Sequence, residues 1–407
     1  MRIVERSLPR DGGALGKTMD TRAMLRRIRL RPLAACVAAT LAFAPLRIGL
    51  AADLPVTSCA DDGSLGTLRS VIGGADEGDT IDLTRLTCST ITLAGTPIDI
   101  GWLGDYPVNG LTLQGPGRDL LTISGGGMSP IFTAGNPQKW GRFTLNDLTI
   151  AHGVKYNGPG CVYDATDLVL NRVTVTDCHS TVSVSFRNGG AMCVVGTLQM
   201  TDSLISDSGT TAIDDVTAAS GGGAWADRAM LINSSISGNQ VSARVGTDRY
   251  DSQLRTGGGG LYVANDVTLT NSTISGNSVI ATDTGENGRG GGLLVRGTAT
   301  ITGSTIEGNS ADGDGGGLFK PIYVYNFDPG TTLTIENSSI AGNWAGSAGG
   351  GLVSERPTTL ANSTVAFNES VLGGGVMFRL TNIPYDSALG TLDLQSTILA
   401  GNTTGAG

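Results

Sequence analysis

The sequence predicts an all-β fold, a single-stranded right-handed parallel β-helix of about ten coils with an N-terminal cap. Three observations predict it: a sequence pattern that returns along the chain, a glycine cluster before each good copy, and a core that must be aliphatic. Glycine supplies 62 of 407 residues against only 14 prolines, and the glycines follow no strict triplet period, which excludes collagen. Hydrophobic residues make up 40 % of the chain but aromatic residues only 5 %, so Val, Ile, Leu and Ala must fill the core, and this favours strands.

The repeat is clearest at 267–277, which reads VTLTNSTISGN. Apolar residues alternate with hydroxyl residues, and this period of two is typical of strands and not of helices. A glycine cluster and a short apolar segment precede it, so one coil is expected to hold three short strands, GGGLYV, VTLT and STIS. Further good copies lie at 229–239, 299–309, 333–343, 358–368 and 392–402, and looser copies at 143–153, 168–178 and 198–208.

A coil of this kind cannot bury its apolar side alone, so the coils must stack, with every strand paired in parallel to its counterparts above and below. Roughly five inward aliphatic side chains per coil contribute about 1.5 to 3 kcal/mol each when buried. The third strand of each coil is expected to supply one continuous aliphatic column. Its predicted members are Ile236, Ile274, Ile306, Ile340 and Val365.

Asparagine ends the repeat in six copies. It tolerates a left-handed backbone, and its side-chain amide can bond to the next amide in a stack, so a structural ladder at a turn explains these residues. We prefer this interpretation to ligand binding. The predicted ladder consists of Asn239, Asn277, Asn309, Asn343, Asn368 and Asn402.

Residues 1–52 are interpreted as an upstream extension followed by a signal peptide. A cationic segment begins at Met24, an apolar run follows from Leu33 to Phe43, and small residues around Ala51 provide a cleavage site. This order of segments predicts export. After residue 52 no stretch reaches the ~18 apolar residues of a membrane-spanning helix, so none is expected in the mature chain.

The mature chain is expected to contain two regions. Residues 53–100 form an N-terminal cap and the first coil, with Leu68 to Gly73 as a short amphipathic helix that covers the apolar end of the β-helix. Residues 101–407 form the β-helix itself. No second cap is recognisable after Asn402, which predicts either a truncated C-terminal end or a last coil that docks on another surface.

Five cysteines lie in the mature part, and export would place them in an oxidising compartment. We predict a bridge between Cys59 and Cys88 and another between Cys161 and Cys178, which leaves Cys193 outside both. The alternative is that the thiols are simply small buried hydrophobic side chains. No cysteine pair has the spacing of a zinc site, and no metal site is predicted.

The repeats resemble those of bacterial right-handed β-helix proteins related to the polymorphic outer membrane proteins, which have a pectin-lyase-like fold. The repeats of this chain and those of the family combine a Gly-Gly-aliphatic motif with a terminal asparagine. The Phe-x-x-Asn form of the family is approached at 365–368. The segments 59–72 and 78–82 are similar to a Cys-Ser-Leu-Arg-Glu-Ala type opening segment of secreted proteins. The resemblance implies a secreted or cell-surface protein associated with the outer membrane.

The chain offers no basic face, because its formal net charge is −9 and only 15 % of its residues are charged. This argues against nucleic acid as a partner. Invariant coils beside insertions of variable length favour an adhesion or ligand-contact scaffold that uses its edge loops, with glycans or cell-surface components as partners. No cofactor is predicted, although calcium was considered. The candidate binding residues are Asp248, Tyr250, Asp251, Asp312 and Asp314.

A polysaccharide lyase or glycoside hydrolase is the alternative function, since enzymes of both kinds occur on parallel β-helices. Such chemistry needs paired carboxylates, or a calcium cluster beside a basic residue. His152 and His179 lie near repeat corners without a recognisable serine or carboxylate partner, so no catalytic residue is predicted. A structural spacer or truncated remnant is the third interpretation. Candidates for sugar stacking are Trp225, Tyr262 and Trp344.

Overall fold

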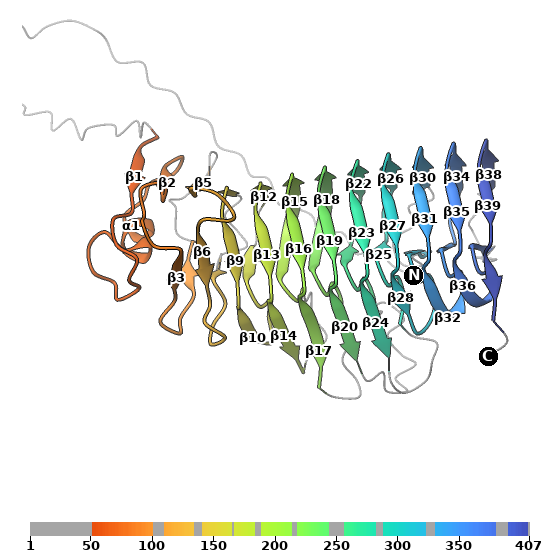
Figure 1. Ribbon diagram of the computed structural model, residues 1–407, viewed down its shortest axis with the longest axis horizontal. Helices are drawn as coiled ribbons and strands as arrows, with labels where there is room; N and C mark the ends of the chain where they lie inside the picture. Colours follow the sequence, from red (N-terminus) through yellow and green to blue (C-terminus); the bar gives the residue numbers. More distant parts are fainter. Residues whose placement is uncertain are drawn as a thin grey trace, which may run out of the picture. The chain divides into compact units, whose positions relative to one another are not determined.

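The fold is a right-handed parallel β-helix in the computed structural model, as the sequence predicts (Figure 1). Three sheets of short strands extend along it, and each strand pairs in parallel with strands of the neighbouring coils. None of the described residues belongs to a helix with the length and apolar character needed to cross a membrane. The described residues are 51–100, 110–133, 141–164, 167–183, 189–213, 218–243, 256–281, 288–322, 330–379 and 390–405.

Sheet 1 is the largest, with 20 strands, because most coils contribute two segments to it. Its strands are β1 (Asp53–Pro55), β2 (Thr80–Asp82), β4 (Ile98–Asp99), β5 (Leu111–Gln114), β7 (Phe132–Thr133), β8 (Arg142–Asn146), β11 (Val162–Asp164), β12 (Asp167–Asn171), β15 (Met192–Thr201), β18 (Ala224–Ile232), β21 (Leu261–Val263), β22 (Val267–Thr270), β25 (Leu293–Val295), β26 (Ala299–Thr302), β29 (Leu318–Lys320), β30 (Leu333–Glu336), β33 (Leu352–Ser354), β34 (Thr358–Ala361), β37 (Val376–Phe378) and β38 (Leu392–Gln395).

Sheet 2 has 11 strands and sheet 3 has nine, and a coil contributes at most one strand to each of them. The strands of sheet 2 are β3 (Thr90–Thr92), β6 (Thr122–Ser124), β9 (Thr149–Ala151), β13 (Thr174–Thr176), β16 (Leu204–Ser206), β19 (Ser235–Ser237), β23 (Thr273–Ser275), β27 (Thr305–Glu307), β31 (Ser339–Ala341), β35 (Thr364–Ala366) and β39 (Ile398–Ala400). Those of sheet 3 are β10 (Val154–Tyr156), β14 (His179–Val182), β17 (Gly209–Ala212), β20 (Gln240–Ala243), β24 (Ser278–Ala281), β28 (Ser310–Ala311), β32 (Trp344–Ala348), β36 (Glu369–Leu372) and β40 (Thr403–Thr404).

The three strands predicted for each coil are present, and the structure adds a fourth. The segments GGGLYV and VTLT contribute β21 and β22 to the same sheet, and a fourth strand, β24, supplies the third face. This fourth strand follows the repeat-ending asparagine, in a segment that the sequence analysis treated as part of the insertion. With only four residues, as in Ser278–Ala281, this strand is too short to stand out from a loop in the sequence.

The predicted aliphatic column exists. Parallel pairing in sheet 2 places Ile236 opposite Ile274, Ile274 opposite Ile306, and so on to Val365. These side chains are at most 1 % exposed and belong to one continuous core cluster. The hydroxyl residues on either side of them point outward, so the period of two along each strand separates the core from the surface.

The predicted helix at the first coil is α1 (Leu68–Gly73). Thr67 caps it, since its side chain accepts a hydrogen bond from the backbone N–H of Ser70. Leu68 and Ile72 are buried in the same core as the aliphatic column. The helix therefore packs apolar side chains against the end of the stack at which β1 and β2 lie (Figure 1).

Both predicted disulfides are confirmed. Cys59 is joined to Cys88, and Cys161 is joined to Cys178 within the coil that carries β11, β12, β13 and β14. Cys193 is buried and lies outside both bridges. Two disulfides indicate a protein that folds in an oxidising compartment.

Candidate functional site

The six predicted ladder asparagines lie on successive coils, and each side-chain amide donates to the carboxamide oxygen of the next. Asn277 Nδ2, for example, donates to Asn309 Oδ1 at 2.9 Å, and the backbone N–H of Asn277 donates to the same oxygen at 3.0 Å. The asparagines themselves do not have the left-handed backbone that the sequence analysis assigned to them. That conformation belongs to the preceding residue, such as Gly276 with φ of 61°.

Each coil of the C-terminal half turns twice through this left-handed conformation. The first corner, between sheets 1 and 2, is usually occupied by asparagine, and the second, between sheets 2 and 3, by glycine. Glycine adopts positive φ without steric cost, and asparagine tolerates it better than most residues. The first-corner asparagines are Asn233, Asn271, Asn337 and Asn362, and the second-corner glycines are Gly238, Gly276, Gly308, Gly342 and Gly401.

Three successive coils break this rule at both corners. All their corner residues have φ between 49° and 56°, although none is glycine or asparagine. The left-handed conformation costs most side chains about 1–2 kcal/mol; aspartate and histidine tolerate it better than most residue types, and arginine does not. Unusual corner residues of this kind motivate a hypothesis of function. The first corner column consists of Asp147, Arg172 and Asp202, and the second corner column of His152, Asp177 and Asp207.

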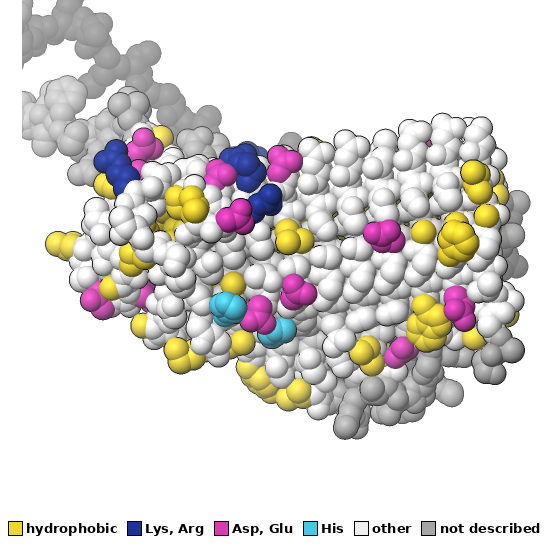
Figure 2. Space-filling model, in the orientation of Figure 1, with side chains coloured by type: hydrophobic (Ala, Val, Ile, Leu, Met, Phe, Trp, Pro, Cys, Tyr) yellow, Lys and Arg dark blue, Asp and Glu magenta, His cyan; other side chains and the backbone are white. Residues whose placement is uncertain are grey.

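Asp177 lies between both histidines of the chain. Its Oδ2 is 2.6 Å from His152 Nδ1 and its Oδ1 is 2.8 Å from His179 Nε2. Figure 2 shows the two imidazoles on either side of the carboxylate at the surface, and each of the three side chains is about half exposed. The hydrogen bond from His152, followed by the one from His179, holds the pKa of the Asp177 carboxyl below its usual value.

The Cys161–Cys178 disulfide fixes the backbone beneath this cluster. Cys178 stands between Asp177 and His179 in the chain. A Cβ atom added to Gly153, the residue after His152, would lie only 2.6 Å from Cys161 Sγ, so the bridge packs directly against this backbone. Cys178 occupies the position that asparagine has in the ladder, and the ladder passes through Ser208, which accepts from the Cys178 N–H at 3.1 Å.

A groove of about 440 Å³ adjoins the second corner column on sheet 3. β10 and β14 form its floor, with Val154 paired to His179 and Tyr156 to Thr181. Tyr156 is 57 % exposed, and its hydroxyl donates to Ser183 Oγ at 2.8 Å, which holds the ring in place. The groove is lined by, among others, Pro97, Met128, Lys155, Tyr156, His179 and Thr181.

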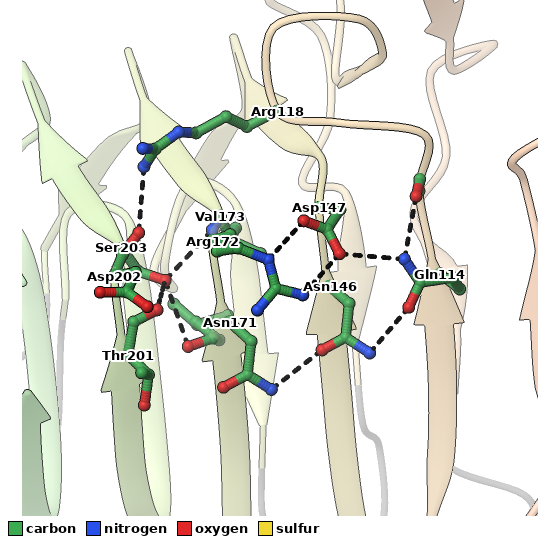
Figure 3. A network of polar contacts seen from close by, with 12 residues as sticks. Gln114, Arg118, Asn146, Asp147, Asn171, Arg172, Val173, Thr201, Asp202 and Ser203 are labelled. Atoms are coloured by element: carbon green, nitrogen blue, oxygen red, sulfur yellow. Dashed lines mark hydrogen bonds and ion pairs between the residues drawn. The ribbon is translucent and has the colours of Figure 1, made fainter.

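The first corner column is held by a separate polar network (Figure 3). Arg172 donates from Nε and Nη2 to the two carboxylate oxygens of Asp147, both at 2.6 Å, and Gln114 donates to the same carboxylate. The hydrogen bond from Arg172 is the main reason that the pKa of Asp147 is lowered. Arg118 reaches over from the loop between β5 and β6 and donates to the Asp202 carbonyl oxygen at 3.0 Å.

Of the predicted binding residues, Asp248, Tyr250 and Asp251 lie outside the described residues. Asp312 and Asp314 lie between β28 and β29, and β28 is four strands from β14 in sheet 3. The Asp312 carboxylate accepts from the Ala281 N–H at 2.9 Å. Asp314 is buried, and both its oxygens accept from Arg379, at 2.7 and 2.9 Å.

The aromatic residues predicted for sugar stacking, Trp225, Tyr262 and Trp344, are not among the residues that line the groove. Trp225 and Tyr262 are buried and stack on each other with their ring centroids 6.3 Å apart, whereas Trp344 is 43 % exposed. The exposed ring beside the groove, Tyr156, was missed. So was Asp177, although an alignment of the repeats would have shown His152 and Asp177 at a position that other coils give to glycine.

The described residues contain no group of three or more His, Cys, Asp or Glu side chains arranged to hold a metal ion. In the His152–Asp177–His179 cluster, the imidazoles instead form hydrogen bonds with the carboxylate. Asp177 orients His179 through Nε2, and the ring lines the groove. This arrangement suits hydrogen bonding to a ligand, and proton transfer to or from one.

No family model and no curated protein match the chain. Among solved structures it is similar to a mannuronic acid specific polysaccharide family 6 lyase from human gut microbiota, with 11 % identity over 84 % of this chain and 90 % of that chain and a TM-score of 0.31. It is also similar to the PL6 family alginate lyase AlyGC, with 10 % identity over 86 % of this chain and 78 % of that chain and a TM-score of 0.21. At these values the likeness concerns the fold alone.

Proposed function

We propose that the protein is an exported β-helix scaffold that binds glycans at the groove and the adjoining second corner column. One observation carries the proposal: the coils that form this surface place His152 and Asp177 in a left-handed corner that five of the later coils give to glycine. The turn itself does not require these side chains, so we attribute them to contact with a ligand.

The chemistry of the groove favours a sugar. Tyr156 presents an aromatic ring fixed by its bond to Ser183, and such a ring packs on the apolar face of a sugar. Lys155 supplies hydrogen-bond donors, while the ring nitrogens of His179 and the hydroxyl of Thr181 supply donors and acceptors for sugar hydroxyls. This combination of apolar walls with a few convergent polar groups is typical of ligand sites.

Export to the cell surface is part of the proposal. The segment from Met24 to Ala52 supports a signal peptide, and the two disulfides agree with an oxidising destination. The resemblance of the repeats to the polymorphic outer membrane protein group supports an outer-membrane-associated adhesin. Detection of the mature protein in the surface fraction of the producing cells, with its N-terminus near residue 52, is the expected result.

Isothermal titration against a panel of plant, microbial and animal polysaccharides tests the binding function. Wild-type protein is expected to bind at least one of them, and Tyr156→Ala to weaken binding about tenfold or more, as stacking contributes about 1 kcal/mol beyond area burial. Trp344→Ala is the matched control, because Trp344 is an exposed aromatic residue on the same sheet but distant coils. A blank panel, or equal effects of the two substitutions, would contradict the proposal.

A polysaccharide lyase or hydrolase is the second candidate, and the Asp177–His179 pair favours it. A carboxylate that orients an imidazole at a groove is the arrangement of a general base. Incubation of the same polysaccharides with the protein, with and without calcium, is expected to release unsaturated products or new reducing ends, and His179→Ala to abolish the release. Polymers that stay intact under every condition would exclude this candidate while leaving the binding function in place.

A further inference from the structure

We infer that the bound glycan is a neutral oligosaccharide several units long, which extends from the groove across sheet 2 to the first corner column. This inference rests on the proposed function, because it adds a second contact region to the same site. The two corner columns belong to the same three coils, and they flank β9, β13 and β16 on both sides.

The spacing of the two columns sets the length of the ligand. In each of these coils the corners are five residues apart, as between Asp147 and His152. Extended chain rises about 3.3 Å per residue, so the columns lie about 16 Å apart across the sheet. A single sugar ring in the groove does not reach the first corner column, whereas an extended oligosaccharide does.

The surface between the columns is suited to such a ligand. Four of the six outward side chains of the three strands carry hydroxyl groups, the other two being Ala151 and Leu204. Thr176 and Ser206 share a hydrogen bond of 3.0 Å across neighbouring coils. Figure 2 shows this area largely white, with the charged side chains of the two columns on either side of it. Hydroxyl groups both donate and accept, which matches the hydroxyl groups of sugars.

The charges favour a neutral glycan over an acidic one. Counted over arginine, lysine and aspartate alone, the two columns with Arg118 and Lys155 carry three cations, Arg118, Arg172 and Lys155, and four carboxylates, a formal net charge of −1. The formal charge of the whole chain is −9, so a polyanionic glycan is repelled at long range. Sugar hydroxyls instead donate to the carboxylates and accept from the guanidinium and ammonium groups. The carboxylates are Asp147, Asp177, Asp202 and Asp207.

Arg118 is the residue expected to contact the far end of the glycan. Among the described residues its guanidinium has one hydrogen bond, to the carbonyl oxygen of Asp202, and the side chain is exposed. A guanidinium has five N–H donors, so several remain for a ligand. Arg172 differs, because two of its donors are taken by Asp147.

Titration with cello-, manno- and laminari-oligosaccharides, from the monosaccharide to the hexasaccharide, tests the inference. Affinity is expected to rise with chain length until the ligand spans both columns. Arg118→Ala is expected to weaken hexasaccharide binding about tenfold and to leave disaccharide binding unchanged, because a hydrogen bond to a charged donor contributes about 1.5 kcal/mol or more. Tyr156→Ala is expected to weaken both. Arg85→Ala changes an exposed arginine that belongs neither to the groove nor to the two corner columns, and it is the control that should leave binding unchanged.

The outcomes separate the inference from the proposed function. Affinity that does not depend on chain length, or hexasaccharide binding unaffected by Arg118→Ala, overturns the inference. If Tyr156→Ala still weakens binding in that case, glycan binding at the groove remains supported. Polygalacturonate oligosaccharides that bind more tightly than neutral ones of equal length overturn the neutral class. Absence of binding to every glycan overturns both.

Discussion

Asp177 occupies the centre of the proposed site, because its carboxylate contacts both histidines of the chain. The contact with His152 joins residues that are 25 positions apart in sequence but adjacent in the stack, whereas His179 lies only two residues after Asp177. The same side chain stands in a left-handed corner between a buried core strand and a disulfide. Its geometry is therefore fixed by the fold on both sides, which is what a preorganised binding residue requires.

The titration of Asp177 is the first prediction. Carbon-detected NMR is expected to give its carboxyl a pKa below the ordinary aspartate value, and His152→Ala to raise that pKa more than His179→Ala, since the His152 hydrogen bond is the larger cause. The pKa of Asp177 is lower in the folded state than in the unfolded state, so its hydrogen bonds with the histidines stabilise the fold at pH values above the unfolded-state pKa. This contribution is lost as the pH falls through the folded-state pKa. An ordinary aspartate pKa for Asp177, or a larger rise of that pKa in His179→Ala than in His152→Ala, would contradict the prediction.

The second prediction concerns the strain at His152. Replacement by glycine, the residue of the equivalent corners, is expected to raise the free energy of unfolding by about 1 kcal/mol while weakening glycan binding. Phe367→Gly is the matched control, since Phe367 has φ of 56° at the same corner of a distant coil and is 73 % exposed. It should stabilise the protein similarly and leave binding intact. Denaturant unfolding and titration calorimetry measure both; His152→Gly with unchanged binding would count against the site.

At the scale of elements, ladders of hydrogen-bonded polar side chains link the corners of successive coils. Besides the asparagine ladder, a serine follows the first corner of successive coils, and each serine hydroxyl accepts from the N–H of the serine one coil earlier, as Ser304 does from Ser272. Both ladders reach the coil of β16, at Ser203 and Ser208, and asparagine and serine are absent from their positions in the two coils before it. The proposed site lies where this regular corner structure changes.

The third prediction tests the asparagine ladder. Asn309 is buried, and its oxygen accepts from both the backbone and the side-chain N–H of Asn277. Asn309→Ala leaves these buried donors without an acceptor and is expected to cost about 2 to 4 kcal/mol in chemical denaturation. The control is Asn265→Ala at an exposed asparagine that bonds to Asp227, with a cost within about 0.5 kcal/mol. Equal costs for the two substitutions would show that the ladder does not stabilise the stack.

The elements differ in how far they could be predicted. Alternation in segments such as VTLT and STIS determined the inward residues, and parallel stacking followed because one coil cannot bury its own core. The third sheet was missed because Ser278–Ala281 carries only two apolar residues between small ones. Lys320 was also unforeseen: it occupies a position equivalent to Val295 in the stack, is fully buried, and donates to the Arg296 carbonyl oxygen at 2.9 Å.

The site was harder to predict than the fold for a physical reason. The histidines were recognised, but their carboxylate partner depends on which residues of adjacent coils share a corner, and coil lengths vary with the insertions. Tyr156 was missed for a similar reason, since its exposure depends on the unpredicted sheet 3.

At the scale of the whole molecule, one continuous aliphatic core extends through the described residues from Val56 to Val365, and the fourth prediction concerns this core. Ile274→Asp places an unpaired charge in the column and is expected to destabilise the protein by several kcal/mol. Thr273→Asp, one residue earlier on the outward side of β23, is the matched control with a small effect. Thermal unfolding of the two variants measures the difference. An unchanged melting temperature for Ile274→Asp would refute the stacked core.

Hydrogen exchange with and without a glycan that binds tests the central claim most directly, because it locates the ligand on the chain without any substitution. The account predicts added protection in the segments 152–157 and 177–183, which carry the second corner column and the floor of the groove, with the later coils unchanged. Protection confined to the coils after residue 256, with none in these two segments, would contradict it.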